Sequence, residues 1–320
     1  MKLKQLLFIF VVFVSLTKLN AQITINTSNT PTQLVDGVLV PSGSGTTISN
    51  VVFRGVYNNS ANSQLGYFST ATTTLAQMGF AEGVVLATGN VQGIPLALGA
   101  DPGASQWTAG YSSCTPGEIR ESGASCFTTD PAIVNDLNSL AGAINFFNAA
   151  ILEFDFVPVE NSVEFRYIFG SEEYNDSSNS AFDTNYNCSQ YNDKFGFLIS
   201  GSDIVGDPGY GANTRNIARL ANGSEVSINS VNDGIVGSTA SPQGASYCTA
   251  ANGAWTQNTP SPEFLGTIDG TQLNGNTRIL TATQTGLTPG ATYHIKLIIL
   301  DVRDSGYDSV VYLEAGSFTT

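Results

Sequence analysis

Two groups of carboxylates follow apolar stretches of the chain, and together they supply the ligand type that calcium prefers. The first group begins just after Phe169 and the second just after Leu300. Calcium takes six to eight oxygen ligands, and the spacing here is not that of an EF-hand loop. We expect Glu172, Glu173 and Asp193 to share one calcium ion with some of Asp301, Asp304 and Asp308. The alternative is that all six are solvated turn residues or caps. The six carboxylates are Glu172, Glu173, Asp193, Asp301, Asp304 and Asp308.

The same residue types raise the alternative of glycoside hydrolysis, which needs two carboxylates flanking the scissile bond. Glu172 and Glu173 are adjacent and point apart on an extended chain. Glu153 and Asp155 are neighbours on one face of a strand, roughly 6 to 7 Å apart, which argues against them as a catalytic pair. A secreted hydrolase acting on glycans is therefore the less favoured alternative to a binding protein.

Histidine-dependent catalysis would rest on His294, the single histidine of the chain. It alternates with Tyr293 and Ile295, which places it on the opposite face of a strand from the main apolar stripe. No Gly-x-Ser-x-Gly motif accompanies it. The sequence predicts a hydrogen-bonded strand residue here rather than a catalytic base.

Several aromatic residues lie in predicted loops, where their rings could stack on sugars. The candidates for ligand binding are Trp107, Tyr111 and Trp255, and Tyr186 and Tyr191 share the same loop setting. The alternative is that each ring packs at the edge of the core, which is the commoner fate of tryptophan.

The four cysteines predict disulfide bonds, because the N-terminal residues predict export to an oxidising compartment. Cys114, Cys126, Cys188 and Cys248 allow three pairings. Pairing Cys114 with Cys126 would close a short loop and leave Cys188 with Cys248 for a long one. A structural zinc site is disfavoured, since no Cys-x-x-Cys pair occurs.

Residues 1–21 have the order of a signal peptide: Lys2 and Lys4, then an apolar run, then Ala21 before Gln22. No later stretch approaches 18 uninterrupted apolar residues, so we expect no membrane insertion of the mature chain. The formal net charge of −14 argues against a nucleic-acid partner. The sequence thus predicts a secreted or extracellular surface protein, with residues 22–320 forming one domain.

Strict alternation of apolar and polar residues predicts two neighbouring strands. Leu152, Phe154 and Phe156 alternate with Glu153 and Asp155, and residues 163–169 repeat the pattern after a turn at 158–162. Two such runs joined by a short turn favour an antiparallel hairpin.

The remaining pattern favours an all-β fold, an antiparallel, jelly-roll-like β-sandwich. A helix is expected from Asp130, as cap, to Gly142, with a shorter one at 72–78. Residues 90–129 and 233–263 read as long surface loops. Residues 293–300 are apolar on both sides at their far end, which predicts a central strand. Further strands are expected at 48–53, 84–88, 195–200, 225–231, 278–282 and 310–315.

An ordered series of segments resembles the choice-of-anchor L domain. The series includes residues 151–158 (ILEFDFVP), 169–174 (FGSEEY), 192–197 (NDKFGF), 216–218, 226–232, 293–297 and 307–318, with N-terminal agreement at 33–35, 48–51, 66–68 and 83–89. The resemblance implies a bacterial exported surface protein, and it implies no catalytic residue. Such domains are commonly followed by an anchoring module, whereas this sequence stops at Thr320, so we expect free secretion, a longer parent protein or attachment through a partner.

These observations predict a non-catalytic surface module with structural calcium. Its expected role is adhesion or binding of carbohydrate, with extracellular polysaccharide or another surface protein as the partner.

Overall fold

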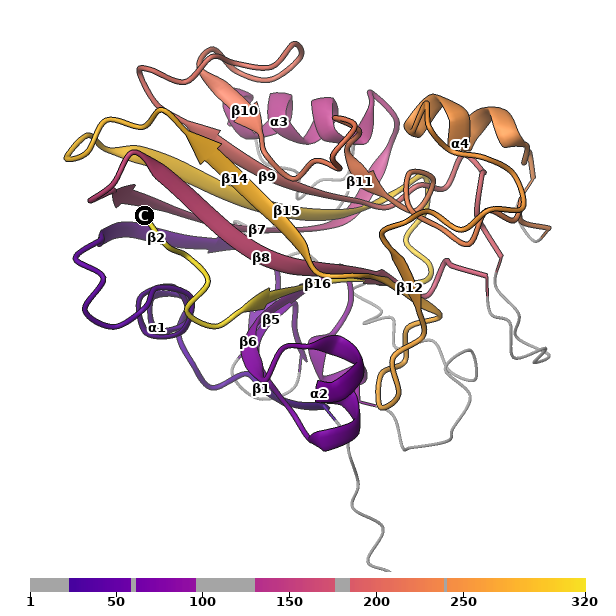
Figure 1. The fold of residues 1–320 in the computed structure, drawn as a ribbon, viewed down its shortest axis with the longest axis horizontal. Helices are drawn as coiled ribbons and strands as arrows, with labels where there is room; N and C mark the ends of the chain where they lie inside the picture. The colour runs from indigo at the N-terminus through magenta and orange to yellow at the C-terminus, as the bar shows by residue number, and fades with distance from the viewer. Residues whose placement is uncertain (1–22, 59–61, 96–129, 176–184, 239–240) are drawn as a thin grey trace, which may run out of the picture.

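Two antiparallel sheets pack face to face in the computed structural model, which describes residues 23–58, 62–95, 130–175, 185–238 and 241–320 (Figure 1). The predicted signal peptide, Trp107, Tyr111, Cys114 and Cys126 lie outside these residues. Among the described residues, no helix is long and apolar enough to cross a membrane. The fold is a β-sandwich, as the alternating pattern predicts.

The first sheet has eight described strands. Along the sheet they follow the order β1 (Ile23–Asn26), β5 (Leu65–Thr70), β6 (Glu82–Ala87), β16 (Ser309–Glu314), β8 (Ser162–Ser171), β13 (Gly275–Thr277) and β12 (Phe264–Gly266), and β14 (Leu280–Thr285) also pairs with β8.

The second sheet has six described strands. Their order is β10 (Thr214–Asn216), β9 (Lys194–Ser200), β15 (Tyr293–Val302), β7 (Phe146–Val157) and β2 (Thr47–Arg54), and β11 (Val226–Ser227) also pairs with β9. A separate short ladder joins β3 (Tyr57–Asn58) to β4 (Asn62–Ser63). The central strand predicted at 293–300 is confirmed, since β15 lies between β9 and β7.

The predicted hairpin between β7 and β8 is wrong, because these two strands belong to opposite sheets. β7 pairs with β15 and β2, whereas β8 pairs with β13, β14 and β16. The connection between β7 and β8 instead forms hydrogen bonds with the segment before β15. The N–H of Leu287 donates to the carbonyl of Asn161, and the N–H of Gly290 donates to the carbonyl of Pro158. The apolar faces of the two strands therefore meet across the core instead of side by side.

Aromatic side chains fill much of the space between the sheets. The ring of Phe165 lies 4.9 Å from that of Phe197 and 4.7 Å from that of Phe318, measured between centroids. Phe318 also contacts Phe154 and Phe156 of the other sheet. The last residues of the chain thus form part of the core.

Helix α3 (Pro131–Ala141) covers the outer face of the second sheet (Figure 1). Asp130 caps it by accepting a hydrogen bond from the N–H of Ala132 at 3.0 Å, and Gly142 ends it in a left-handed conformation. Its apolar side packs on the outward side chains of β7, β9 and β15. This contact explains why β15 is apolar on both faces.

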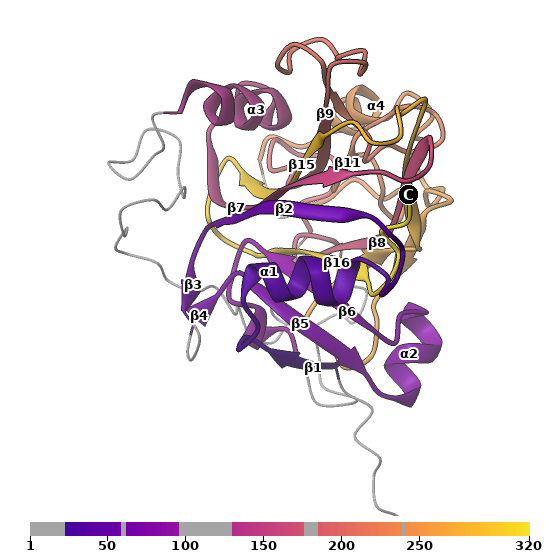
Figure 2. The same cartoon turned by 90° about the vertical axis from the view of Figure 1, so that its left-hand side faces the viewer.

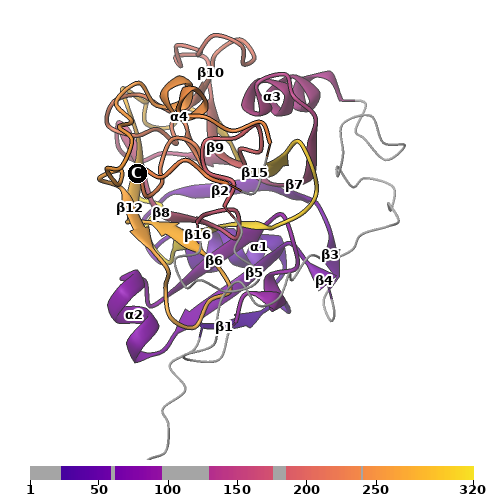
Figure 3. The same cartoon turned by 90° about the vertical axis from the view of Figure 1, so that its right-hand side faces the viewer.

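The other described helices are shorter than α3. Figure 2 shows α1 (Pro31–Leu34), which continues as the π-helix η1 (Val35–Leu39), between β2 and β5. The predicted α2 (Thr72–Met78) is present, and η2 (Val91–Gly93) is a 3₁₀ turn. Figure 3 shows α4 (Ala245–Ala251) at the same end of the molecule as β12. This helix lies within the predicted loop 233–263.

The strand predicted at 225–231 is shorter than expected. Only Val226 and Ser227 pair with β9, after which the chain turns. The hydroxyl of Ser230 donates to the carbonyl of Ser227, and the amide of Asn232 donates to the carbonyl of Ile228 at 2.9 Å. These local bonds replace the ladder bonds that a longer strand would make.

Candidate functional site

Five of the six predicted carboxylates lie buried together at one end of the sandwich. Each is at most 3% exposed, and Asp304 is half-buried beside them. They come from the end of β8, the start of β9, the end of β15 and the start of β16. We call this group the carboxylate cluster: Glu172, Glu173, Asp193, Asp301 and Asp308.

Two hydrogen bonds from backbone N–H groups join Glu172 to Asp308. The N–H of Glu172 donates to the carbonyl of Asp308 at 3.1 Å. In return, the N–H of Asp308 donates to Oε2 of Glu172 at 3.2 Å. The segment after β8 and the segment before β16 are thereby fastened to each other, which brings the two acidic groups of the sequence together.

Asp193 links the two sheets. Its Oδ1 accepts a hydrogen bond from the N–H of Val302 at 3.0 Å, and its Oδ2 accepts one from the hydroxyl of Ser309 at 2.7 Å. Val302 ends β15 in the second sheet, whereas Ser309 begins β16 in the first. The Asp193 carboxylate therefore stabilises the contact between the sheets at this end.

Three oxygens of the cluster have no hydrogen-bond partner among the described residues. They are Oε2 of Glu173, Oδ1 of Asp301 and Oδ2 of Asp308. The second oxygen of Asp301 accepts a bond from Asn148 at 2.8 Å, and that of Asp308 accepts one from Thr88 at 3.2 Å. Burying a charged carboxylate oxygen without a partner is costly, so this setting disfavours the charged form of these groups.

Glycine at position 89 permits the close packing around Asp308. A Cβ atom at Gly89 would lie 2.2 Å from Oδ2 of Asp308. Any larger residue would therefore displace one of the three unpartnered oxygens.

Burial raises the pKa of Asp193 to about 8, against the lowering effect of its bonds from Ser309 and Val302. Burial likewise raises the pKa of Asp308 to about 7, although the bond from Thr88 lowers it. Desolvation disfavours the charged form of a carboxyl group, which is the cause in both cases.

The pKa values of Glu173, Asp301 and the neighbouring Asp304 are raised as well. Burial, and then the charges of Asp193 and Asp304, hold the pKa of Glu173 well above its usual range. Burial, and then the charges of Asp193 and Asp308, do the same for Asp301. Burial also raises the pKa of Asp304. Mutual repulsion of this kind disappears when a cation or shared protons neutralise the group.

The oxygens of the cluster do not converge on a single point. Within the described part of the chain, no group of three or more His, Cys, Asp or Glu side chains has an arrangement that could hold a metal ion. A cation could join these carboxylates only after side-chain rotation. The polar neighbours Thr88, Asn148 and Ser309 carry no motif that would reveal them in the sequence, because each lies more than 100 residues from the carboxylate it bonds.

His294 has the structural role that its strand position predicts. Its Nδ1 lies 2.7 Å from Oδ1 of Asp155, and its Nε2 lies 3.4 Å from Oε2 of Glu153. Glu153 also accepts a bond from Arg54 at 2.6 Å. Glu153 and Asp155 thus form part of a cross-strand network of charges on the outer face of the second sheet.

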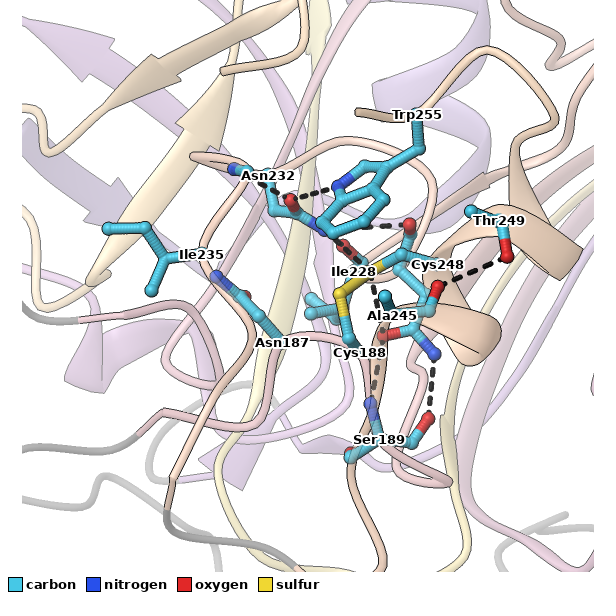
Figure 4. The surroundings of a disulfide bond; sticks show 12 residues. Asn187, Cys188, Ser189, Ile228, Asn232, Ile235, Ala245, Cys248, Thr249 and Trp255 are labelled. Carbon is cyan, nitrogen blue, oxygen red and sulfur yellow. Dashed lines mark hydrogen bonds between the residues drawn. A yellow bond between two sulfur atoms is a disulfide. The ribbon is translucent and has the colours of Figure 1, made fainter. Parts of the chain in front are cut away.

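A disulfide joins Cys188 to Cys248 across a sequence separation of 60 residues (Figure 4). It packs with Trp255, whose indole N–H donates to Oδ1 of Asn232 at 2.8 Å. Trp255 is 7% exposed and lines a pocket. The rings of Tyr186 and Tyr191, also considered for ligand binding, lie against each other with centroids 5.3 Å apart.

Fold and site together define an all-β module whose acidic loops meet at one end of a sandwich. The family model named Choice-of-anchor L domain matches residues 22–319, and the chain belongs to this family. Membership indicates a surface-associated module. Comparisons with curated proteins and with solved structures found no match.

Proposed function

We propose that this protein is a non-catalytic module outside the cell that binds carbohydrate at a surface and is stabilised by calcium in the carboxylate cluster. Its family supports surface association. The signal peptide predicted at residues 1–21 supports export.

The observation that carries the calcium proposal is the burial of three unpartnered carboxylate oxygens, on Glu173, Asp301 and Asp308, beside Asp193. Calcium accepts carboxylates, side-chain amides and backbone carbonyls in flexible geometry, which suits a cluster whose side chains have to rotate to bind it. Burial, and then repulsion, raise the pKa values of Glu173 and Asp301, and one divalent ion would offset both effects.

The alternative of a glycan hydrolase receives less support. A general acid has to reach its substrate, and carboxyl groups with raised pKa values are the usual candidates. The cluster has such groups, but they are at most 3% exposed. Neither the pocket beside Trp255 nor the one beside Arg215 is lined by a member of the cluster.

A calcium titration of chelator-treated protein tests the metal site. We expect calcium to raise the melting temperature, because a ligand at 100 times its Kd stabilises the folded state by about 2.7 kcal/mol. Glu173→Gln removes one ligand charge and is expected to abolish most of this rise. Glu164→Gln, at an exposed position of the preceding strand β8, is the matched control and should respond like the wild type. An unchanged melting temperature in the wild type contradicts the calcium site.

Carbohydrate binding is tested separately, with a glycan array and a broad screen for glycoside hydrolysis. The proposal expects retention on the array without release of product. Release of product by the purified protein would instead establish the hydrolase.

A further inference from the structure

A pocket of about 340 Å³ lies beside Trp255, far along the chain from the carboxylate cluster. The indole of Trp255, together with Pro260 and Pro262, supplies its apolar lining, and Asn222, Asn252 and Glu263 supply polar atoms. The volume falls at the lower end of the range for small-ligand sites, which run from about 300 to 1,000 Å³.

The lining of the pocket is held rigidly by bonds within the described residues. The indole N–H of Trp255 is fixed by Asn232, and the Cys188–Cys248 disulfide packs beside the indole (Figure 4). The side-chain amide of Asn252 donates to the carbonyl of Ser230 at 2.8 Å.

Asn252 also orients the rim. Its Oδ1 accepts a hydrogen bond from the amide of Asn222 at 2.6 Å and another from the N–H of Ala254 at 2.9 Å. These bonds leave little freedom to be lost when a ligand binds, and such preorganisation favours affinity.

The side chains of the pocket select for one chemical class. Among the described residues, no lysine or arginine lines the pocket and Glu263 is the one charged residue of its lining, so the pocket disfavours phosphate, sulfate and carboxylate groups. The rings of Trp255, Pro260 and Pro262 match the apolar C–H face of a pyranose, and the hydroxyl of Thr256 and the carboxylate of Glu263 match its hydroxyl groups. A lipid chain would remove Thr256 and Glu263 from water without replacing their hydrogen bonds.

We propose that the pocket beside Trp255 binds a terminal sugar residue of a neutral glycan. This inference rests on the proposed function as a carbohydrate-binding module and names the site and the ligand class. Recognition would combine stacking against the pocket wall with hydrogen bonds to the rim, and it needs no metal ion.

The test uses an array of neutral oligosaccharides of glucose, galactose, mannose and N-acetylglucosamine, together with acidic glycans. Calorimetric titration with the best-bound free sugar follows. Ala254→Arg places a long side chain in the pocket from an exposed position, and Thr256→Arg does so from a second one. Gln257→Arg, exposed and outside the lining, adds the same charge and is the matched control.

We expect a neutral glycan to bind, each pocket-filling variant to weaken its affinity at least tenfold, and the control to stay within twofold of the wild type. Equal melting temperatures show that the variants are folded, and a variant that is not folded is replaced by the other. Binding of neutral glycans that survives both substitutions, or binding of acidic glycans alone, overturns this inference and leaves the proposed function standing. Absence of binding to every glycan overturns both.

Discussion

The carboxylates of this protein show how environment gives one residue type two different roles. Glu153 lies on the outer face of a sheet beside Arg54 and His294, and these partners lower its pKa despite the raising effect of its burial. Asp193 and Asp301 lie between the sheets among other acids, and their pKa values are raised. The partners of Glu153 favour its charged form, whereas the surroundings of Asp193 and Asp301 favour the neutral form.

His294 is expected to make stability depend on pH. Burial lowers its pKa, but its bonds to Glu153 and Asp155 outweigh this effect and raise the pKa above 6.5. A raised folded-state pKa means that the contribution is complete below about pH 6.5 and is lost as pH rises through the folded value. We therefore expect His294→Gln to lower the urea midpoint more at pH 5.5 than at pH 9.

The control for this prediction is Arg54→Gln, which removes a partner of Glu153 that stays charged at both pH values. Its cost should be similar at pH 5.5 and pH 9. An equal cost of His294→Gln at the two pH values would refute the assignment. The depressed pKa of Glu153 acts in the opposite direction: its contribution is present above pH 4.5 and fades as pH falls through the folded value.

Strands β7 and β8 show that the alternation of apolar and polar residues predicts where a strand lies but not which strand it pairs with. Alternation correctly identified both strands, and it correctly assigned Phe154 and Phe165 to buried faces. It did not identify their partners, because an inward face can meet its complement across a sandwich as well as beside a neighbour on the same sheet. The pairings with β15 and β16, which lie more than 130 residues further along, decide the topology.

The segment around α4 is expected to depend on its disulfide. Cys188 and Cys248 close a separation of 60 residues, for which the chain-entropy relation gives a loss of about 4 kcal/mol on removal. The double variant Cys188→Ser, Cys248→Ser should therefore have a markedly lower denaturation midpoint under oxidising conditions. Adding reductant to the double variant is the control, because it shows the contribution of the remaining Cys114 and Cys126 to the midpoint. A double variant with the wild-type midpoint under oxidising conditions would contradict the prediction.

For the whole molecule, the sandwich depends on contacts between the ends of the chain and its middle. Phe318 is fully buried and contacts Phe154, Phe156 and Phe165. Helix α1 and η1 bring Leu34 and Leu39 into the same core. Residues near both ends of the described chain therefore share one hydrophobic core with the two sheets.

Phe318→Ala is expected to cost about 3–5 kcal/mol of unfolding free energy, the usual range for truncating a buried phenylalanine. Denaturant unfolding measures this loss. Val205→Ala removes apolar atoms from a side chain that is 80% exposed and should change stability by less than about 0.5 kcal/mol. A similar small change for Phe318→Ala would mean that the C-terminal residues are dispensable for the core.

The sequence by itself determined the fold class, the central strand β15, the helices α2 and α3, and the residues of the carboxylate cluster. Periodicity, caps and residue chemistry are local properties, so a linear pattern contains them. Only the tertiary structure decided that β7 and β8 lie in opposite sheets and that Asp193 meets Asp301 and Asp308. Those facts depend on contacts between residues far apart in the chain, which close only when the whole hydrophobic core forms.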